Sequence, residues 1–396
     1  MDKLFISRLE IKQVRHLRDI TIPLSEQRAK HLILTGKNGS GKTSVTEALA
    51  RYLNKIYIGE SEQAFRNCQK ELDIKLNNNI DEIPELAEKH HYILAYYEAD
   101  RMFCAEQPKH VEKVQLKDYY ELTEFQRIDF VKYLLDLKMT EALARNNNKI
   151  QKADEIKDWF AELEQMLKQI FDDETVKLEF DEDTFEFHIL QQGKEPFDFF
   201  TLSRGYQAVL DIVLDIMMRM QHQTQRSFHF DLPGIVIIDE IETHLHLELQ
   251  RTILPFLTTF FPDIQFIVTS HSPFILNSID NVVIYDLENH TLVEHGLNDV
   301  PYEGIVEGYF RVDKLSNTLK EKFDTYKNLV MKENLSDDEL GEIAELELFL
   351  DEIPDYLAIG IATEYKRMKL EFMNREDIDG YVWVHAEEYP QLQKCL

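Results

Sequence analysis

A glycine-rich loop near the amino terminus carries the residues best suited to chemistry. Residues 36–43 match the phosphate-binding pattern G-x-x-x-x-G-K-[ST] in full. The glycines allow backbone N–H groups to surround a phosphate, Lys42 can reach the β- and γ-phosphate oxygens, and Thr43 can offer its hydroxyl to Mg²⁺. The loop therefore predicts a site for ATP and Mg²⁺. The residues expected to bind the nucleotide here are Gly36, Lys37, Asn38, Gly39, Ser40, Gly41, Lys42, Thr43 and Ser44.

A pair of acidic residues forms the second candidate. Residues 234–240 read Gly-Ile-Val-Ile-Ile-Asp-Glu, which is typical of a buried parallel strand with carboxylates at the edge where α/β proteins bind ligands. Together with the phosphate loop, this pattern predicts that Asp239 holds Mg²⁺ through water and that Glu240 polarises the attacking water. The alternative is an exposed acidic pair at the end of a strand.

Two further sequence patterns give weaker indications of residues that contact phosphate. The apolar run 264–269 leads to Ser270 and His271, and an imidazole there could sense the γ-phosphate and fix the water, although a lone histidine at a strand end is usually structural. Residues 201–207 read Thr-Leu-Ser-Arg-Gly-Tyr-Gln and precede a long apolar helix. Ser203 and Gly205 therefore form an anion-binding arrangement at a helix start, but an ordinary N-cap explains Ser203 equally well.

The elements that must position these residues alternate between strands and helices. Short strands are expected before the phosphate loop and within 91–101, a helix after the loop, and buried strands at 234–238 and 264–269 separated by a helix. This alternation predicts an α/β fold with a sheet flanked by helices. Residues 60–90 look helical or irregular. Long charged helices between about 117 and 171, joined by a turn at 144–149, predict a short helical hairpin, and a strand hairpin is expected at 175–190.

Composition narrows the class of protein further. The 396 residues are 44% hydrophobic, enough for two or three domains, and the last hundred residues are mostly helical and acidic in pattern. A net charge of −29 disfavours general capture of DNA, although a local basic groove would permit it. Cys68, Cys104 and Cys395 lie far apart and form no CxxC pattern. No apolar run approaches the roughly 20 residues of a membrane helix, so we expect a cytoplasmic protein with no membrane partner.

The order of these motifs resembles the ABC-type ATPase heads of the SMC, RecF and OLD supergroup. The resemblance covers roughly residues 1–295 and includes LFISRLEIKQVRHLRDITIPL, AYYEADR, LSRGYQ, DEIETHLH and TSHSPFIL, which look most like compact ATPases of prokaryotic antiphage systems of the PARIS, Septu or retron-associated type. It implies an ABC-ATPase head, a P-loop NTPase with a mixed sheet flanked by helices, a helical-hairpin insertion and a helical, acidic C-terminal region. The domains expected are 1–103, 104–174, 175–295 and 296–396.

The resemblance also implies how the site is assembled. Ser203, Gly205 and Gln207 would cap the nucleotide bound to a second copy, so that ATP clamps a head-to-head dimer, with Glu240 as the base and His271 as the switch histidine. Arg204 replaces a glycine of the usual signature, and no Q-loop glutamine is evident. The corresponding strand ends near Arg101, which is expected to contact phosphate or the partner subunit.

Three hypotheses for function come from this comparison. The first is an ATPase that forms a dimer or a higher oligomer and acts as sensor or scaffold for a separate effector such as a nuclease or toxin. The second is a RecF-like repair ATPase that clamps DNA directly. The third is a nuclease in its own right, for which no acidic metal cluster is evident in the C-terminal region. A metal site at Glu242, His244 and His246 is a minor alternative.

Overall fold

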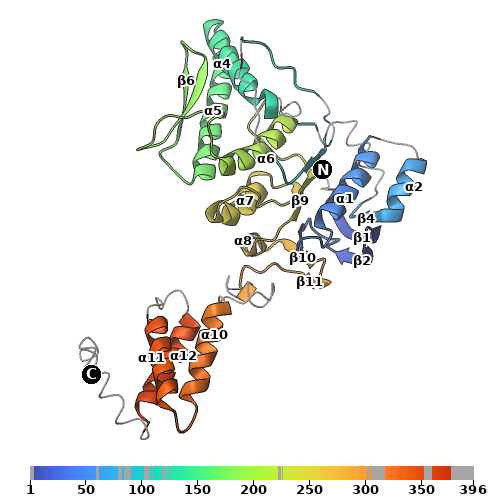
Figure 1. Ribbon diagram of the computed structural model, residues 1–396. Helices are drawn as coiled ribbons and strands as arrows, with labels where there is room; N and C mark the ends of the chain where they lie inside the picture. Colours follow the sequence, from blue (N-terminus) through green and yellow to red (C-terminus); the bar gives the residue numbers. More distant parts are fainter. Residues whose placement is uncertain are drawn as a thin grey trace. The chain divides into compact units, whose positions relative to one another are not determined.

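The computed structural model divides the chain into two compact units, Met1–Tyr302 and Glu303–Leu396, which are described separately (Figure 1). The finer division into four segments stays a prediction. Cys68 is half-buried and takes part in no disulfide bond among the described residues, whereas Cys104 and Cys395 lie outside these residues. The described ranges are 4–58, 62–78, 91–101, 110–117, 127–221, 226–300, 317–351 and 359–375, with single positions between some of them.

A six-stranded mixed sheet forms the centre of the first unit. Its order is β11-β10-β3-β9-β8-β5, in which only β11 runs antiparallel to its neighbour. The five parallel strands are buried along their whole length, as expected for strands covered on both faces. This confirms the mixed α/β fold. The strands are β3 (His31–Thr35), β5 (Ile93–Tyr97), β8 (Gly234–Ile238), β9 (Ile264–Thr269), β10 (Val282–Asp286) and β11 (Thr291–Val293).

The strand order decides which loops meet. Strand β9 lies between β3 and β8, with Ile267 paired to both Leu32 and Ile237. Because the carboxyl ends of parallel strands share one edge of a sheet, the loops after β3, β9 and β8 lie side by side. Three motifs that are far apart in the sequence are therefore neighbours.

Helices cover the sheet and carry two of the motifs. Helix α1 packs against β8 and β9 on one side and against β1 and β4 on the other, and its apolar residues share a core with Ile235 and Ile237. Helix α6 contacts β5 and α7 and is buried along most of its length. Figure 1 shows α1 and α7 on opposite sides of the sheet. The helices are α1 (Lys42–Tyr57), α6 (Arg204–Met220), α7 (Leu247–Phe260) and α8 (Pro273–Leu276).

A second, antiparallel sheet packs beyond α1, in the order β2-β1-β4. Strand β4 corrects the expectation of a helical or irregular stretch at 60–90, because the alternating sequence Leu-Asp-Ile-Lys-Leu buries its apolar residues against β1. Gln265 of β9 joins the two sheets through hydrogen bonds to both backbone groups of Ile6. The elements are β1 (Ile6–Val14), β2 (Leu17–Pro23), α2 (Glu62–Glu71) and β4 (Leu72–Leu76).

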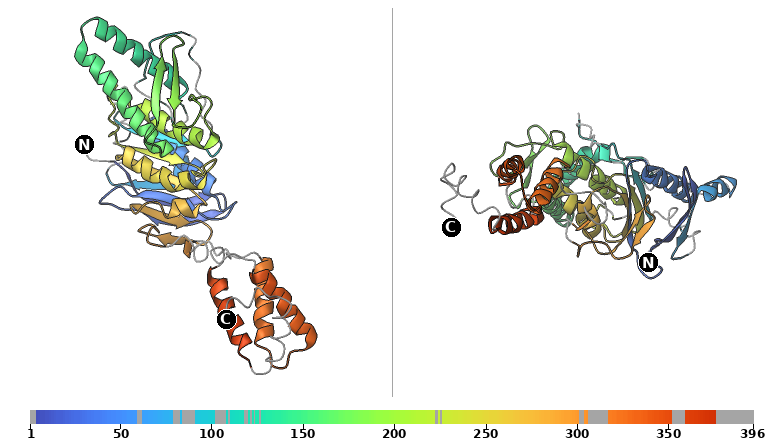
Figure 2. Two further views of the ribbon diagram at one scale, coloured as in Figure 1. Left: turned by 90° about the vertical axis from the view of Figure 1, so that its left-hand side faces the viewer. Right: turned by 60° about the horizontal axis from the view of Figure 1, so that its bottom comes forward.

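The expected helical hairpin is present between β5 and α6. It turns at 147–149, where Asn148 has a positive φ of 58°. Strands β6 and β7 lie against α5 (Figure 2). The sequence pattern placed the first helix from about 117, but residues 111–117 have no regular structure and the helix begins at Phe130. The elements are η1 (Arg127–Asp129), α4 (Phe130–Asn146), α5 (Ile150–Phe171), β6 (Lys177–Asp181) and β7 (Glu186–Leu190).

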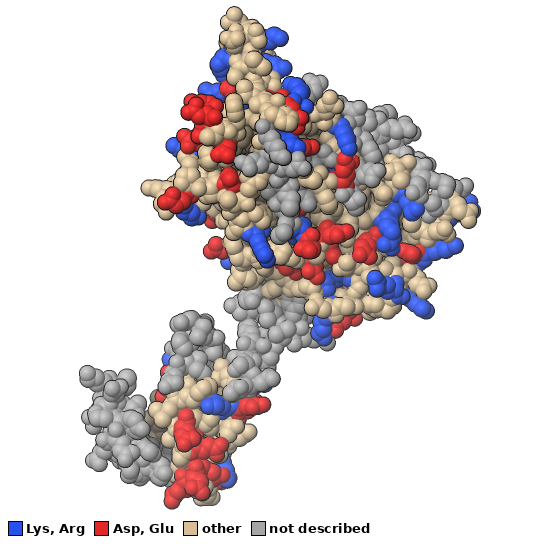
Figure 3. All heavy atoms as spheres, turned by 45° about the horizontal axis from the view of Figure 1, so that its top comes forward, with Lys and Arg blue, Asp and Glu red and all other residues tan. Residues whose placement is uncertain are grey.

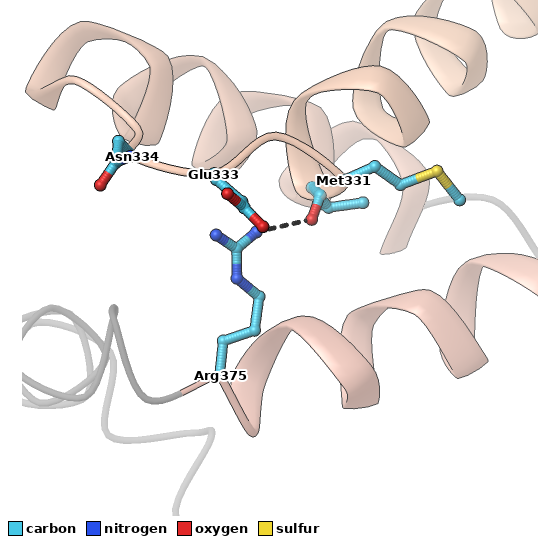
Figure 4. A pocket seen from close by; sticks show the side chains of 5 residues that line it. Met331, Glu333, Asn334 and Arg375 are labelled. Atoms are coloured by element: carbon cyan, nitrogen blue, oxygen red, sulfur yellow. Dashed lines mark hydrogen bonds between the residues drawn. The ribbon is translucent and has the colours of Figure 1, made fainter.

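The second unit is a bundle of helices with its own apolar core, which includes Phe323, Tyr326, Ile343 and Phe372. Acidic side chains gather on its surface (Figure 3). A pocket of about 490 Å³ lies at one end, where Arg375 donates a hydrogen bond to the Val330 carbonyl at 2.8 Å (Figure 4). No helix in the described ranges has the length and apolar composition needed to cross a bilayer. The helices are α10 (Asn317–Val330), α11 (Asp337–Asp351) and α12 (Ile359–Met373).

Candidate functional site

The glycine-rich loop has the backbone that its sequence predicts. Gly36, Gly39 and Gly41 have φ values of 131°, 84° and 100°, which residues with a Cβ atom rarely adopt. Space is short as well, because a Cβ atom at Gly36 would lie 2.8 Å from the Ser40 hydroxyl and one at Gly41 would lie 2.8 Å from the Leu17 side chain. The loop therefore requires glycine at these positions.

Lys42 lies inside this loop. Its side chain is 5% exposed, and the ammonium donates hydrogen bonds to the carbonyls of Gly36 at 2.8 Å and Lys37 at 3.0 Å. Burial lowers the pKa of Lys42, and neighbouring carboxylates oppose this effect, Glu240 the most, followed by Glu242 and Asp239. The ammonium therefore lies within electrostatic reach of the acidic residues that follow β8.

The loop 36–43 contains exposed residues and an unpaired hydroxyl group that could bind an anion. The Ser40 hydroxyl is buried without a hydrogen-bond partner, which is unfavourable unless a ligand supplies one. Asn38, Gly39 and Thr43 are exposed, and Ser44 is half-buried. Lys37 is exposed and its ammonium pairs with Glu288 at 2.9 Å. A phosphate fits this loop, since an oxygen of the ligand could accept a hydrogen bond from Ser40.

The acidic pair lies at the same edge of the sheet. Asp239 is 2% exposed, and its Oδ1 atom accepts a hydrogen bond from the Thr269 hydroxyl at 2.6 Å. That hydroxyl also accepts one from the Glu240 N–H at 2.7 Å. The Glu240 carboxylate accepts a hydrogen bond from Thr243 at 3.2 Å and is only half-buried. One acid is thus locked in the core while the other remains accessible.

His271 follows the middle strand of the three. Its backbone N–H donates to the Glu242 carboxylate, whose second oxygen is buried without a hydrogen-bond partner. Ser270 is fully buried, and its N–H donates to the Leu34 carbonyl of β3 at 3.0 Å. The loops after β8 and β9 are therefore tied to one another, the loop after β9 is also bonded to strand β3, and His271 is half-buried beside them.

The start of α6 lies against a different part of the site. Ser203 is the exposed N-cap residue, and its side chain makes no capping hydrogen bond. Gly205 is buried, and a Cβ atom there would lie 3.2 Å from the His244 carbonyl. Gln207 donates its N–H to the Ser203 carbonyl at 3.0 Å and is half-buried. Within the described ranges, no hydrogen bond or ion pair joins residues 203–207 to residues 36–43.

Arg101 has a different environment from the one expected. It is 4% exposed, and its two terminal nitrogens donate to four backbone carbonyls. Instead of facing a phosphate or a second chain, the guanidinium lies under the loop that carries the acidic pair. The acceptors are Glu98 at 3.0 Å, Asp239 at 2.8 Å, Glu240 at 3.0 Å and Ile241 at 2.8 Å.

Two residues link the loops of the site in a way that the sequence did not predict. Thr269 and Glu242 each bond to groups on a neighbouring loop. For Thr269 the available signal was a polar residue at the end of a buried apolar run. Among the described residues, no group of three or more His, Cys, Asp or Glu side chains is arranged to hold a metal ion. This corrects the minor alternative of a metal site at Glu242, His244 and His246.

The chain matches a known protein family and is similar in sequence to several known proteins. The family model described as "AAA domain, putative AbiEii toxin, Type IV TA system" matches residues 54–277, more than half of the chain. The Septu protein PtuA of Bacillus mycoides (strain KBAB4) is 26% identical over an alignment of 392 residues, which covers 90% of this chain and 51% of that protein. The chain thus spans about half the length of this relative.

Two further relatives match shorter parts. The Retron Ec83 probable ATPase of Escherichia coli is 34% identical over 36% of this chain and 27% of its own length. The Retron Vc95 probable ATPase of Vibrio cholerae serotype O1 biovar El Tor is 39% identical over 23% of this chain and 18% of its own length.

Solved structures of SMC head domains are distantly similar. The SMC head bound to the C-winged helix domain of ScpA has 14% sequence identity and a TM-score of 0.38, covering 75% of this chain and 100% of that one. The SMC head domain from Thermotoga maritima has 12% identity and a TM-score of 0.36, covering 71% and 94%.

Proposed function

We propose a function from the premise that this chain belongs to the family described as "AAA domain, putative AbiEii toxin, Type IV TA system". In this proposal, the protein is an ATPase of a prokaryotic antiphage defence system that works as a dimer and controls a separate effector, a nuclease or a toxin. The observation that carries the ATPase assignment is the position of Lys42, which lies inside a glycine-rich loop and within electrostatic reach of the carboxylates of Asp239 and Glu240.

Binding comes first in this mechanism. The triphosphate enters the loop 36–43, where backbone N–H groups, the Ser40 hydroxyl and the start of α1 receive it. The Lys42 ammonium leaves the Gly36 and Lys37 carbonyls and moves to the phosphate oxygens, which exchanges neutral acceptors for charged ones. Thr43 and Asp239 would hold Mg²⁺, which neutralises charge on the phosphates when bound.

Hydrolysis requires a base with access to water. Glu240 is suited to this task because its carboxylate is accessible and its backbone is tied to Thr269. It orients a water molecule toward the γ-phosphate and accepts a proton from it, while His271, at the end of the neighbouring strand, contacts the γ-phosphate. ADP and inorganic phosphate are the products.

The dimer supplies the remaining contact. Ser203 is exposed at the start of α6 and has no capping partner in its own chain, which suits a residue that binds the phosphate held by a second copy. The Septu and retron relatives support a defence role, and the acidic helical unit offers a surface for an effector with basic groups. ATP binding would then assemble the complex and hydrolysis would release it.

The test is ATP hydrolysis by the purified chain, with two variants that separate binding from catalysis. Lys42→Ala should weaken ATP binding by about ten- to hundredfold, because charge-assisted hydrogen bonds are lost. Glu240→Gln should bind ATP normally and hydrolyse it about 10²- to 10⁴-fold more slowly. Normal hydrolysis by Glu240→Gln would contradict the role of Glu240 as base.

Control of an effector is tested separately. The Glu240→Gln variant is purified together with the protein encoded by the gene next to its own, and the native mass is measured with and without Mg-ATP. A complex that contains a second protein only with ATP supports the scaffold. ATP-dependent dimers that recruit only DNA would contradict it.

A further inference from the structure

The backbone of Glu240 has a conformation that needs support. Its φ of +44° lies in the left-handed region, which is unfavourable for a residue with a Cβ atom. Such conformations persist when surrounding contacts determine them, and they concentrate at functional sites. The contacts around this peptide therefore help to determine the direction in which the Glu240 carboxylate points.

The guanidinium of Arg101 supplies several of these contacts, beside those from Thr269 and Thr243. It donates to the carbonyls of three successive residues, Asp239 at 2.8 Å, Glu240 at 3.0 Å and Ile241 at 2.8 Å. A fourth bond, to the Glu98 carbonyl, ties the group to the loop after β5. Both peptide planes next to the Glu240 Cα atom are thus anchored to one rigid, planar group.

A carboxylate on helix α6 also compensates the positive charge of Arg101. Burial lowers the pKa of Arg101, and among the carboxylates that oppose this effect Asp211 of α6 is the strongest. Asp211 is fully buried, so its carboxylate acts on Arg101 through the protein interior, where charges are poorly screened. The guanidinium is therefore bonded to the acidic loop and lies within electrostatic reach of α6.

We propose that Arg101 is a positioning residue for hydrolysis: it holds the Glu240 peptide in the left-handed conformation and so aims the carboxylate. This inference rests on the proposed function, in which Glu240 is the base. Arg101 does not contact the nucleotide in this scheme. Lysine cannot replace it, because an ammonium group lacks the planar arrangement of donors that reaches carbonyls on successive residues.

The central experiment is Arg101→Lys, measured for ATP affinity and for kcat. We expect kcat to fall by about ten- to hundredfold, since small displacements of a catalytic group cost that much, while ATP affinity stays within about twofold. Arg226→Lys is the matched control, because Arg226 also bonds to a carbonyl and a carboxylate, those of Val114 and Asp136. Its kcat should remain that of the wild type.

A second comparison shows whether Arg101 acts through Glu240. In single-turnover measurements, Arg101→Lys should lower the rate strongly in the wild type and by less than about twofold in Glu240→Gln, because groups that act as a unit are not additive. Equal fold reductions in both backgrounds would overturn the proposal. The proposal would also be overturned if Arg101→Lys left kcat unchanged while Glu240→Gln lowered it. If the wild-type protein does not hydrolyse ATP at all, the proposed function itself is overturned.

Protein stability provides a readout that does not depend on activity. Glycine adopts a positive φ without support, so Glu240→Gly should reduce the destabilisation caused by Arg101→Lys, and Glu240→Ala should not. If Arg101→Lys alone fails to fold, the double variant with Glu240→Gly should recover the folded state. Equal destabilisation in the glycine and alanine backgrounds, or failure to fold in both, would show that Arg101 is an ordinary core residue.

Discussion

The hydroxyl of Thr269 donates a hydrogen bond to the Oδ1 atom of Asp239, 2.6 Å away on the neighbouring strand. The Thr269 hydroxyl oxygen also accepts the backbone N–H of Glu240 at 2.7 Å, so one side chain of β9 orients both acidic residues that follow β8. Parallel pairing of Ile238 with Val268 brings these groups to the same level. The acidic pair is therefore held by its neighbour in the sheet as well as by its own strand.

Thr269→Val tests this relationship, because valine has nearly the same shape and no hydroxyl. We expect kcat for ATP hydrolysis to fall about tenfold or more and stability to fall by about 1–3 kcal/mol, since the Asp239 carboxylate and the Glu240 N–H lose their partner. Steady-state kinetics and urea unfolding would measure both effects. Thr269→Ser keeps the hydroxyl and should preserve kcat; equal losses in the two variants would assign the effect to packing.

Ser203 is predicted to act on the nucleotide bound by a second copy. Ser203→Glu and Lys42→Ala should each be nearly inactive, because one repels phosphate at the signature and the other weakens the phosphate loop. Mixing the two should restore part of the activity, since one of the two sites in a mixed dimer then combines an intact loop with an intact Ser203.

The control for this mixture carries both changes on one chain. Lys42→Ala mixed with the double variant Lys42→Ala and Ser203→Glu should remain inactive, because no intact phosphate loop is present. If the two single variants also fail to complement each other, although native mass shows that mixed dimers form, Ser203 does not act across the dimer.

His31 is predicted to make folding stability depend on pH. The ring is 9% exposed, burial lowers its pKa to about 4, and its Nδ1 atom accepts the Phe266 N–H at 3.1 Å. The unfolded value is about 6.5, so the contribution is complete above pH 6.5 and is lost as the pH falls toward 4, in total about 3 kcal/mol. Urea unfolding of His31→Gln should show a flatter dependence over this interval; identical slopes would contradict the prediction.

Gln265 is predicted to hold the two sheets together. Its buried amide bonds to Ile6 at 2.8 and 2.9 Å and to the Lys30 carbonyl at 2.7 Å. Gln265→Leu should lower the free energy of unfolding by about 2–4 kcal/mol, because three backbone groups lose their partner. Gln192→Leu, on an exposed side chain, should change it by less than about 0.5 kcal/mol. Similar values for the two variants would show that Gln265 contributes no special link.

Several elements were predictable because their signals are local. The apolar run 31–35, the glycine loop and the helix from Lys42 are contiguous, and each requires only its own residues to be recognised. The strand at Leu72–Leu76 escaped prediction because it is short and flanked by polar residues, and it is stabilised by pairing with β1. Pairing partners of this kind are distant in the sequence.

Local pattern was enough to identify the phosphate loop, the acidic strand end and the α/β class, because glycines, periodicity and strand-end acids act over a few residues. Only the folded chain placed β9 between β3 and β8, brought Thr269 to Asp239, and turned Arg101 toward the carbonyls beside Glu240. Strand order and the orientation of a buried guanidinium depend on which distant groups can satisfy one another in the core. That choice involves the whole sheet at once, and no single segment contains it.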